Sequence, residues 1–358
     1  MKTRKLTSQL IMAMLAVAGN VSAEDKLTIT PFTLNANEEA AIEVCLQNEK
    51  EYGGLQFVLT LPDGMSICED EYGLIYSLTD RVKYGRDNDT KFQNSIDKRS
   101  DGTYFVLIWN SDGETVSGNS GDPIMTITVK ASDQISTTNN QCVLSDIRLA
   151  SVNGVPSEGT NIESETVDVT LQVPAKIAAS GYGSFSWPRA LDFSETSAKV
   201  FVGTRTSDGW LHLESVDDGK IPANTGVILK GTSGQVYPQT IDQEVTLTKE
   251  NLLLPTSTAA VPVTADGYYA LATKSAGSGF YLIDKESGVT IPQYKAYLHV
   301  DGSAGSRDAF FFSEDATGLQ NLESVDASSA VAYDLQGRRV DSLAKGIYVK
   351  DGRKIIVK

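Results

Sequence analysis

Histidine, a residue common in catalytic and metal sites, is rare in this sequence. Only His212 and His299 occur in 358 residues, and each lies within an apolar run, which favours a structural role over metal binding or acid–base catalysis. No G-x-S-x-G, H-E-x-x-H or phosphate-binding loop motif is found in the sequence. The sequence therefore predicts a protein that is not an enzyme and needs no cofactor.

Carboxylates are abundant, with 46 Asp and Glu residues. Adjacent acids such as Asp217–Asp218 and Glu69–Glu71 are expected by chance at this density. Spacing in sequence alone does not make a glycosidase pair, which requires two carboxyl groups at a defined separation. We interpret these acids as solvated charges in turns, so a hydrolase is the least favoured function.

Cysteine is also rare, and its number is odd. Cys45, Cys68 and Cys142 allow at most one internal disulfide, with three possible pairings. The equally good alternative is that all three are reduced residues of the core. The lack of a C-x-x-C motif argues against a zinc or redox site.

Long hydrophobic runs are almost missing. The longest, Leu10–Gly19, has about half of the roughly 20 apolar residues that a spanning helix needs, so no transmembrane segment is expected. It follows three cations and precedes the small residues Val21–Ala23, the pattern of a secretory signal. We expect a signal peptide at 1–23, a mature protein from Glu24, and a location outside the cell or on its outer surface.

Cations are outnumbered, because 31 Lys and Arg face 46 Asp and Glu, for a formal charge of −15. Loss of the three cations of the expected signal peptide takes the charge to about −18. Nucleic acids and anionic membranes bind clustered cations. Neither is expected as a partner of so acidic a chain.

Helical spacing is nearly missing too, whereas strand patterns recur. In the run 40–47, Ile42, Val44 and Leu46 alternate with polar neighbours, as in a strand that covers a core on one side. Further runs predict an all-β fold with a jelly-roll-like β-sandwich at 24–173. The predicted strands of this part are 26–34, 40–47, 54–62, 103–110, 124–131, 142–150 and 167–173.

A second antiparallel β domain is predicted at 174–316, beginning where Pro174 interrupts strand pairing. Its predicted strands are 199–205, 210–216, 225–231, 244–250, 268–274, 279–285, 295–300 and 309–315. The polar stretch 317–330 indicates a linker. The tail 331–358 then predicts a miniature sheet, with Asp351–Gly352 as a hairpin turn.

The tail carries seven cations and three acids, which is typical either of a solvated face or of a segment that docks on an acidic body. Its residues Tyr333, Leu335, Gly337, Gly346 and Tyr348 resemble the spacing of type A sorting domains, the C-terminal tails of secreted Bacteroidetes proteins that the type IX secretion system recognises. The resemblance implies a sorting or anchoring role and an interaction with secretion machinery. A hairpin that only stabilises the protein is the alternative.

Two other parts also resemble known families. Segments 181–185, 222–231 and 292–298 resemble a β module of unknown function in surface proteins of the same bacteria. Segments 53–65, 116–131 and 147–155 resemble cohesins and family-3 carbohydrate-binding sandwiches. The second resemblance implies recognition, because cohesins bind dockerins and their relatives bind polysaccharides.

Aromatic residues are the best candidates for ligand binding, because indole and phenol rings stack on sugars. The candidates are Tyr104, Trp109, Trp187 and Trp210, although burial in a core is the commoner fate of such rings. Asp87 and Asp89 are weak candidates for a calcium loop, since the EF-hand spacing is missing. We therefore expect binding of a glycan through the first sandwich, with a surface-protein partner, as for an adhesin or scaffold, as the alternative.

Overall fold

The structure is a computed structural model, and it describes most of the chain from Asp25 to Val357. The described residues are 25–83, 92–110, 112–116, 121–151, 160–301, 307–314, 332–333, 339–340, 346–350 and 353–357. The expected signal peptide, Asp87, Asp89, Gly337 and the linker 317–330 lie outside them. No helix in this part of the chain is long and apolar enough to cross a membrane.

The chain divides into two compact units between Gln172 and Val173, next to the Val173–Pro174 boundary that the sequence predicts. Both are built from strands, which confirms the all-β prediction. The described helices are single turns, α1 (Asp80–Lys83) and the 3-10 turn η2 (Lys285–Ser287).

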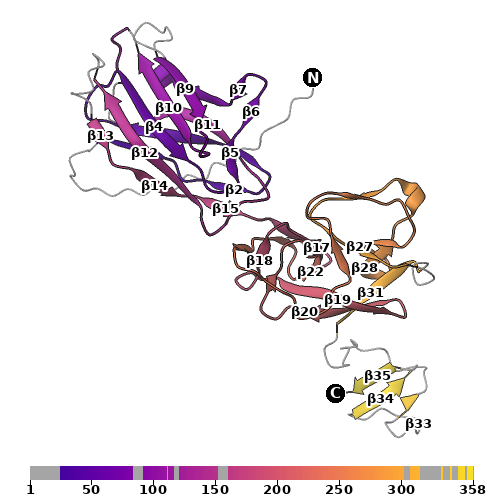
Figure 1. Cartoon of the computed structure of the whole chain (residues 1–358). Helices are drawn as coiled ribbons and strands as arrows, with labels where there is room; N and C mark the ends of the chain where they lie inside the picture. The colour runs from indigo at the N-terminus through magenta and orange to yellow at the C-terminus, as the bar shows by residue number, and fades with distance from the viewer. Residues whose placement is uncertain are drawn as a thin grey trace. The chain divides into compact units, whose positions relative to one another are not determined.

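Unit 1 has two antiparallel sheets that form the layers of a sandwich (Figure 1). The first sheet has the order β1-β3-β11-β5, with β8 also on β11; the second has the order β13-β12-β4-β10-β9, with β14 also on β12. The strands of the first sheet are β1 (Lys26–Ile29), β3 (Glu39–Gln47), β5 (Met65–Ile67), β8 (Tyr76–Leu78) and β11 (Pro123–Ala131). Those of the second are β4 (Gly54–Thr60), β9 (Phe92–Lys98), β10 (Tyr104–Asn110), β12 (Gln141–Ala150), β13 (Thr160–Ile162) and β14 (Glu165–Asp168).

Two short pairs complete unit 1. Strand β2 (Thr33–Asn35) pairs in parallel with β15 (Thr170–Gln172), and β6 (Glu69–Asp70) forms a hairpin with β7 (Gly73–Leu74). Every predicted run of this unit contains a strand. The sequence missed β9, because its central Gln93, Asn94 and Ser95 lack β-branched or aromatic side chains.

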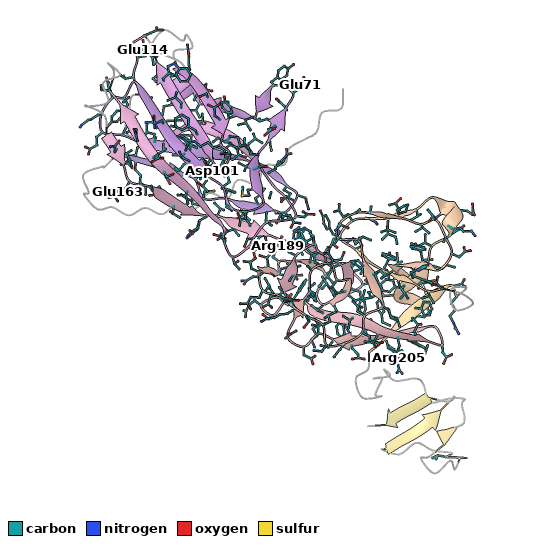
Figure 2. The ribbon with its side chains drawn as sticks, viewed as in Figure 1. Glu71, Asp101, Glu114, Glu163, Arg189 and Arg205 are labelled. Carbon is teal, nitrogen blue, oxygen red and sulfur yellow. The ribbon has the colours of Figure 1, made fainter. Side chains whose placement is uncertain are left out.

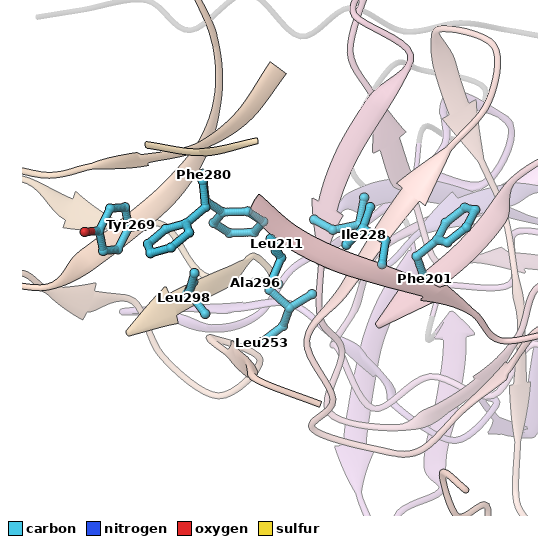
Figure 3. Packing of buried hydrophobic residues seen from close by; sticks show 10 residues of the cluster. Phe201, Leu211, Ile228, Leu253, Tyr269, Phe280, Ala296 and Leu298 are labelled. Carbon is cyan, nitrogen blue, oxygen red and sulfur yellow. The ribbon is translucent and has the colours of Figure 1, made fainter. Parts of the chain in front are cut away.

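Unit 2 is organised around a nine-stranded sheet with the order β17-β22-β19-β20-β31-β28-β27-β30-β25. Ten buried residues on one face of the sheet form its core, among them Tyr269, Phe280 and Phe310 (Figure 3). The strands are β17 (Tyr182–Phe185), β19 (Lys199–Ser207), β20 (Trp210–Ser215), β22 (Val227–Lys230), β25 (Leu253–Pro255), β27 (Tyr268–Lys274), β28 (Gly277–Leu282), β30 (Ala296–His299) and β31 (Ala309–Glu314).

Short strands form three small sheets beside the main one. They are β16 with β23, β18 with β21 and β24, and β26 with β29. Their bounds are β16 (Ala175–Ile177), β18 (Ala190–Asp192), β21 (Lys220–Ile221), β23 (Gly234–Val236), β24 (Gln239–Ile241), β26 (Val261–Pro262) and β29 (Thr290–Ile291).

The strand predicted at 244–250 does not form; this stretch is irregular and contains no buried residue. Its place is taken by the residues that follow. The Gly203 N–H donates to Asn251 Oδ1 at 3.2 Å, and the Gly203 carbonyl accepts from Leu252 N–H at 2.7 Å. These bonds lie where a β-bulge interrupts the pairing of β19 with β20. Residues 244–250, although their side chains alternate as in a strand, therefore do not pair with this part of β19.

The C-terminal segment forms the small sheet that the sequence predicts. Its order is β33-β32-β34-β35, and the register of β34 with β35 pairs Lys350 with Arg353. The strands are β32 (Ala332–Tyr333), β33 (Arg339–Val340), β34 (Gly346–Lys350) and β35 (Arg353–Val357). Tyr333, Gly346 and Tyr348 thus lie on strands, and their sorting role stays a prediction.

Candidate binding surfaces

The outer face of the β13-β12-β4-β10-β9 sheet carries a line of apolar side chains. Residues of β10 alternate, so Tyr104, Val106 and Ile108 are buried in the sandwich, whereas Phe105, Leu107 and Trp109 are half-buried on the opposite face. We call these three the apolar line. Because β10 has neighbours on both sides, the line lies inside the sheet and not along its edge.

Polar residues flank the apolar line on both neighbouring strands. In register with it, β9 presents Gln93, Ser95 and Asp97. On β4 the polar Gln56 lies beside Leu107, whereas the apolar Val58 lies beside Phe105. The guanidinium of Arg99 lies 4.9 Å from the centre of the Phe105 ring. An apolar centre with a polar rim is the composition of a protein–protein interface.

Trp109 is well placed within this face, because its partner on β4 is Gly54. A Cβ at Gly54 would lie 3.0 Å from the Ile108 carbonyl oxygen and 3.7 Å from Trp109 Cβ. Gly54 therefore contributes no side chain of its own beside the indole. On the other side the partner is the exposed Gln93.

Two of the four predicted aromatic candidates are inside the protein, which corrects their assignment as ligand contacts. Tyr104 is 2% exposed, and its hydroxyl accepts from Ile67 N–H. Trp187 is also 2% exposed and packs between Phe185 and Tyr294. Their ring faces are occupied by the cores, as expected for aromatic residues next to strand residues that point inward.

The fourth candidate, Trp210, belongs to a second surface that the sequence analysis missed. It is 37% exposed at the start of β20. In register, Trp210 pairs with Phe311, Phe311 with Gly279, and Ala270 with both Tyr281 and Tyr297. Directly paired residues share a face, so aromatic rings from five adjacent strands lie on the side of the sheet opposite its core.

We call this surface the aromatic strip, and it consists of Trp210, Phe311, Tyr281, Tyr268 and Tyr297. The centroid of Phe311 is 6.2 Å from that of Trp210 and 6.0 Å from that of Tyr281, both edge to face. Tyr268 stacks on Tyr297 at 5.7 Å, and its centroid lies 4.4 Å from the ring of His299. The strip thus has two groups of neighbouring rings, Trp210, Phe311 and Tyr281 at one end and Tyr268 and Tyr297 at the other.

A sequence signal for the strip exists in the aromatic doublets Tyr268–Tyr269, Phe280–Tyr281 and Phe310–Phe311. Adjacent residues of a strand point to opposite faces, so one ring of each doublet enters the core and the other must leave it. Tyr269, Phe280 and Phe310 are the inner members. Counting the tryptophans alone does not reveal this pattern.

Cations border the end of the strip that contains Trp210. The ammonium group of Lys274 lies 4.4 Å from the centre of the Tyr281 ring. Arg307 Nη1 lies 3.5 Å from the position that a Cβ at Gly209, the residue before Trp210, would occupy. Arg205 pairs with His212 on the same side of the sheet and is exposed (Figure 2).

The carboxylates behave as turn residues. Asp218 Oδ1 accepts from Lys220 N–H at 3.1 Å, and Asp70 Oδ1 accepts from Tyr72 N–H at 2.8 Å. Asp217 and Asp218 line a cavity of about 230 Å³ with Lys249, whose ammonium donates to the Ser215 carbonyl and lies 3.5 Å from Glu214. Within the described ranges, no three His, Cys, Asp or Glu side chains gather as a metal site.

Both histidines lie on strands, as expected. His212 Nε2 is 2.8 Å from the hydroxyl of Ser207 on β19, and His299 Nε2 is 3.7 Å from the exposed Asp301. The two imidazoles thus lie on different strands and have different neighbours. They do not form one shared site on the outer face of unit 2.

The three cysteines are buried and free, in agreement with the interpretation that they are reduced core residues. Burial raises the pKa of the Cys142 thiol from 9.0 to about 12 and raises those of Cys45 and Cys68 as well. Thiolates are the reactive form. These thiols are therefore held in the unreactive state.

We predict that a thiol reagent at pH 8 leaves all three cysteines of the folded protein unmodified for hours and modifies them within minutes in denaturant. Because the folded thiol keeps its proton above pH 9, where the unfolded thiol loses it, the contribution of Cys142 to stability is complete at neutral pH and falls as the pH rises toward 12. Cys142→Ala should reduce the loss of melting temperature between pH 8 and pH 10. Rapid labelling of the native protein would contradict the buried placement.

Comparison with solved structures finds β proteins at low sequence identity. A non-cellulosomal cohesin from the archaeon Archaeoglobus fulgidus is similar over 42% of this chain and 86% of its own, with 12% identity and a TM-score of 0.27. The sixth cohesin of scaffoldin B from Acetivibrio cellulolyticus, solved with a Cel5 dockerin, is similar over 42% of this chain and 98% of its own, with 12% identity and a TM-score of 0.31. The major pilin SpaD of Corynebacterium diphtheriae is similar over 81% of this chain and 66% of its own, with 13% identity and a TM-score of 0.28.

No protein-family model matches the chain, and no curated protein matches its sequence. A function is therefore inferred from the surfaces of the two units themselves.

Proposed function

We propose that this chain is a secreted or surface-attached, non-catalytic protein whose first unit binds another protein through the outer face of the β13-β12-β4-β10-β9 sheet. The observation that carries the proposal is the apolar line. Three large apolar side chains in a row on the solvent side of a sandwich have no role in its core, and patches of this kind mark interaction sites.

A protein is favoured over a glycan for this face because of the composition around the line. Tyr104 and Trp109 are both candidate sugar contacts in the sequence, but they point to opposite sides of β10, with Tyr104 buried. Leu107 at the centre offers no flat ring. The rim of Gln56, Gln93 and Asp97 supplies hydrogen-bonding groups around an apolar centre, the arrangement of a standard interface.

The proposal agrees with the resemblance of segments 53–65, 116–131 and 147–155 to cohesins, which bind protein modules. The signal-like residues 1–23 and the sorting-like tail support delivery to the cell exterior. On this account the sandwich provides the partner contact, and the tail provides the location.

The test replaces Trp109 with Ala in the full chain. Proteins from the outer membrane and culture medium of the host are captured on the immobilised chain and identified, and the affinity of the partner is measured by calorimetry. We expect Trp109→Ala to weaken binding about 10- to 30-fold, as for a central interface tryptophan. Tyr72→Ala is the matched control, because Tyr72 is 89% exposed on the same unit but lies outside this face.

Two results would reject the proposal. One is a partner that binds Trp109→Ala as tightly as the native chain while Tyr72→Ala loses it. The other is a glycan array on which the native chain binds a sugar and Trp109→Ala does not. That result would show that this face binds a glycan.

A further inference from the structure

We propose that the aromatic strip of unit 2 binds an acidic polysaccharide, one that contains uronic acid residues. This proposal is independent of the protein-binding face of unit 1, because it concerns a different unit, a different surface and a different class of ligand. It rests on the position of the rings, on their extent across the sheet and on the charges beside them.

The rings of the strip are not needed for the core of unit 2. The core is filled from the other face by Tyr269, Phe280 and Phe310, each at most 2% exposed. By contrast, Trp210 is 37% exposed and Phe311, Tyr268 and Tyr297 are half-buried, whereas Tyr281, under the Lys274 ammonium, is 8% exposed. Aromatic surface kept at the solvent side of a sheet is unfavourable in water unless a ligand covers it.

The extent of the strip fits a chain-like ligand. It crosses five neighbouring strands, from β20 to β30, and strands are about 4.8 Å apart, so the strip is roughly 19 Å long. Small residues, Ala270, Ala272 and Gly279, lie between the rings in register. Gly279 cannot be larger, because a Cβ would lie 2.6 Å from the Phe310 carbonyl oxygen. The sheet thus has flat positions between rings, suited to sugars that stack by their C–H faces.

The charges beside the strip favour an anionic ligand. Lys274, Arg307 and Arg205 are all exposed around Trp210, Phe311 and Tyr281. Two exposed acids lie next to them in the chain, Asp208 before Trp210 and Asp308 after Arg307, so the three cations outnumber the neighbouring acids by one. In a protein with 15 more acids than cations, this is a local excess of positive charge. Carboxylates spaced along a sugar chain complement it, and the lysine already placed over Tyr281 shows how a cation and a ring share one contact.

Nucleic acid is the less suitable polyanion for this surface. Its phosphates are closely spaced, and its affinity depends on many Lys and Arg contacts at once. Three cations on a strongly acidic chain match a ligand of lower charge density. The two ligands can be separated experimentally by direct comparison.

The experiment uses affinity electrophoresis and calorimetry of the full chain with polygalacturonate, alginate, hyaluronate and chondroitin, with carboxyl-reduced polygalacturonate as the neutral probe and single-stranded DNA as the alternative polyanion. We expect retardation by at least one acidic polysaccharide. Trp210→Ala should weaken that binding about tenfold, and Trp210→Phe should retain most of it. Lys274→Gln should weaken binding to the acidic probe several-fold without affecting a neutral one.

Controls distinguish the strip from other surfaces. Tyr237→Ala removes a 40% exposed tyrosine of the same unit outside the strip and should leave binding unchanged. Trp109→Ala should also bind normally, so a failure of the unit 1 proposal does not affect this one. Unchanged melting of each variant shows that the fold is intact.

The proposal is overturned if none of the four acidic polysaccharides retards the chain. It is also overturned if the neutral probe binds as tightly as its acidic form, if DNA binds more tightly than every polysaccharide, or if Trp210→Ala and Lys274→Gln both bind like the native chain.

Discussion

Phe280→Ala is expected to destabilise unit 2 by about 4 kcal/mol, the usual cost of emptying a fully buried phenylalanine site. Phe280 is 0% exposed on β28 and belongs to the ten-residue core (Figure 3). Its ring also makes an edge-to-face contact with Phe312 at 6.0 Å. The surrounding strands are fixed by ladder hydrogen bonds on both sides, so the cavity cannot collapse.

Calorimetry of the full chain is the appropriate measurement, because the two units have separate cores and the substitution should lower only the transition of unit 2. Leu254→Ala is the matched control, since Leu254 is 39% exposed on β25 and should cost less than about 1 kcal/mol. An equal loss in both variants, or a shift of both transitions, would show that Phe280 is not the centre of an independent core.

Arg81→Ala is the second large effect, with an expected loss of about 2 to 3 kcal/mol from unit 1. The Arg81 guanidinium donates to the Leu46 carbonyl at 2.6 Å, to the Asp122 carbonyl at 2.7 Å and to Asn48 Oδ1 at 2.7 Å. It thus fastens α1 to the end of β3 and to the residue before β11. Burial lowers the pKa of this guanidinium, but arginine stays protonated at any pH used for folding studies.

Removal of the side chain leaves three acceptors to find other partners, and Asn48 is only 2% exposed. Arg81→Lys should recover only part of the lost stability. The lysine keeps the positive charge, but its ammonium group cannot reach all three acceptors as the planar guanidinium does. Lys98→Ala, which removes an exposed cation from β9, should change stability by less than about 0.5 kcal/mol. Chemical denaturation followed by the fluorescence of Trp109 measures all three. A loss below 1 kcal/mol for Arg81→Ala would mean that water replaces these bonds freely.

The protein-binding proposal and the polysaccharide proposal assign different ligand classes to the outer faces of different sheets. In both cases the functional side chains stand on strands whose other side chains fill a core. Their positions are therefore set by the register of rigid sheets, which holds recognition groups more precisely than loops do.

Alternation of side chains along the strands determined much of this protein at the level of sequence. It specified an all-β chain and a small C-terminal sheet, since period-two patterns and turn residues act over short distances. It also placed Trp109 in the predicted strand 103–110, where burial in the core was the favoured interpretation, whereas the structure has Trp109 half-buried on the outer face. In unit 1, the strands β5 to β9 and β13 were missed because their polar or short sequences form strands only through their partners.

Tertiary structure alone decided which rings are available to a ligand. Tyr104 and Trp187 are enclosed, whereas Trp210 joins Phe311, Tyr281, Tyr268 and Tyr297 on one face. These residues lie up to 101 positions apart in the chain, from 210 to 311. Strand order and register bring them together, and both depend on long-range pairing that no local pattern encodes.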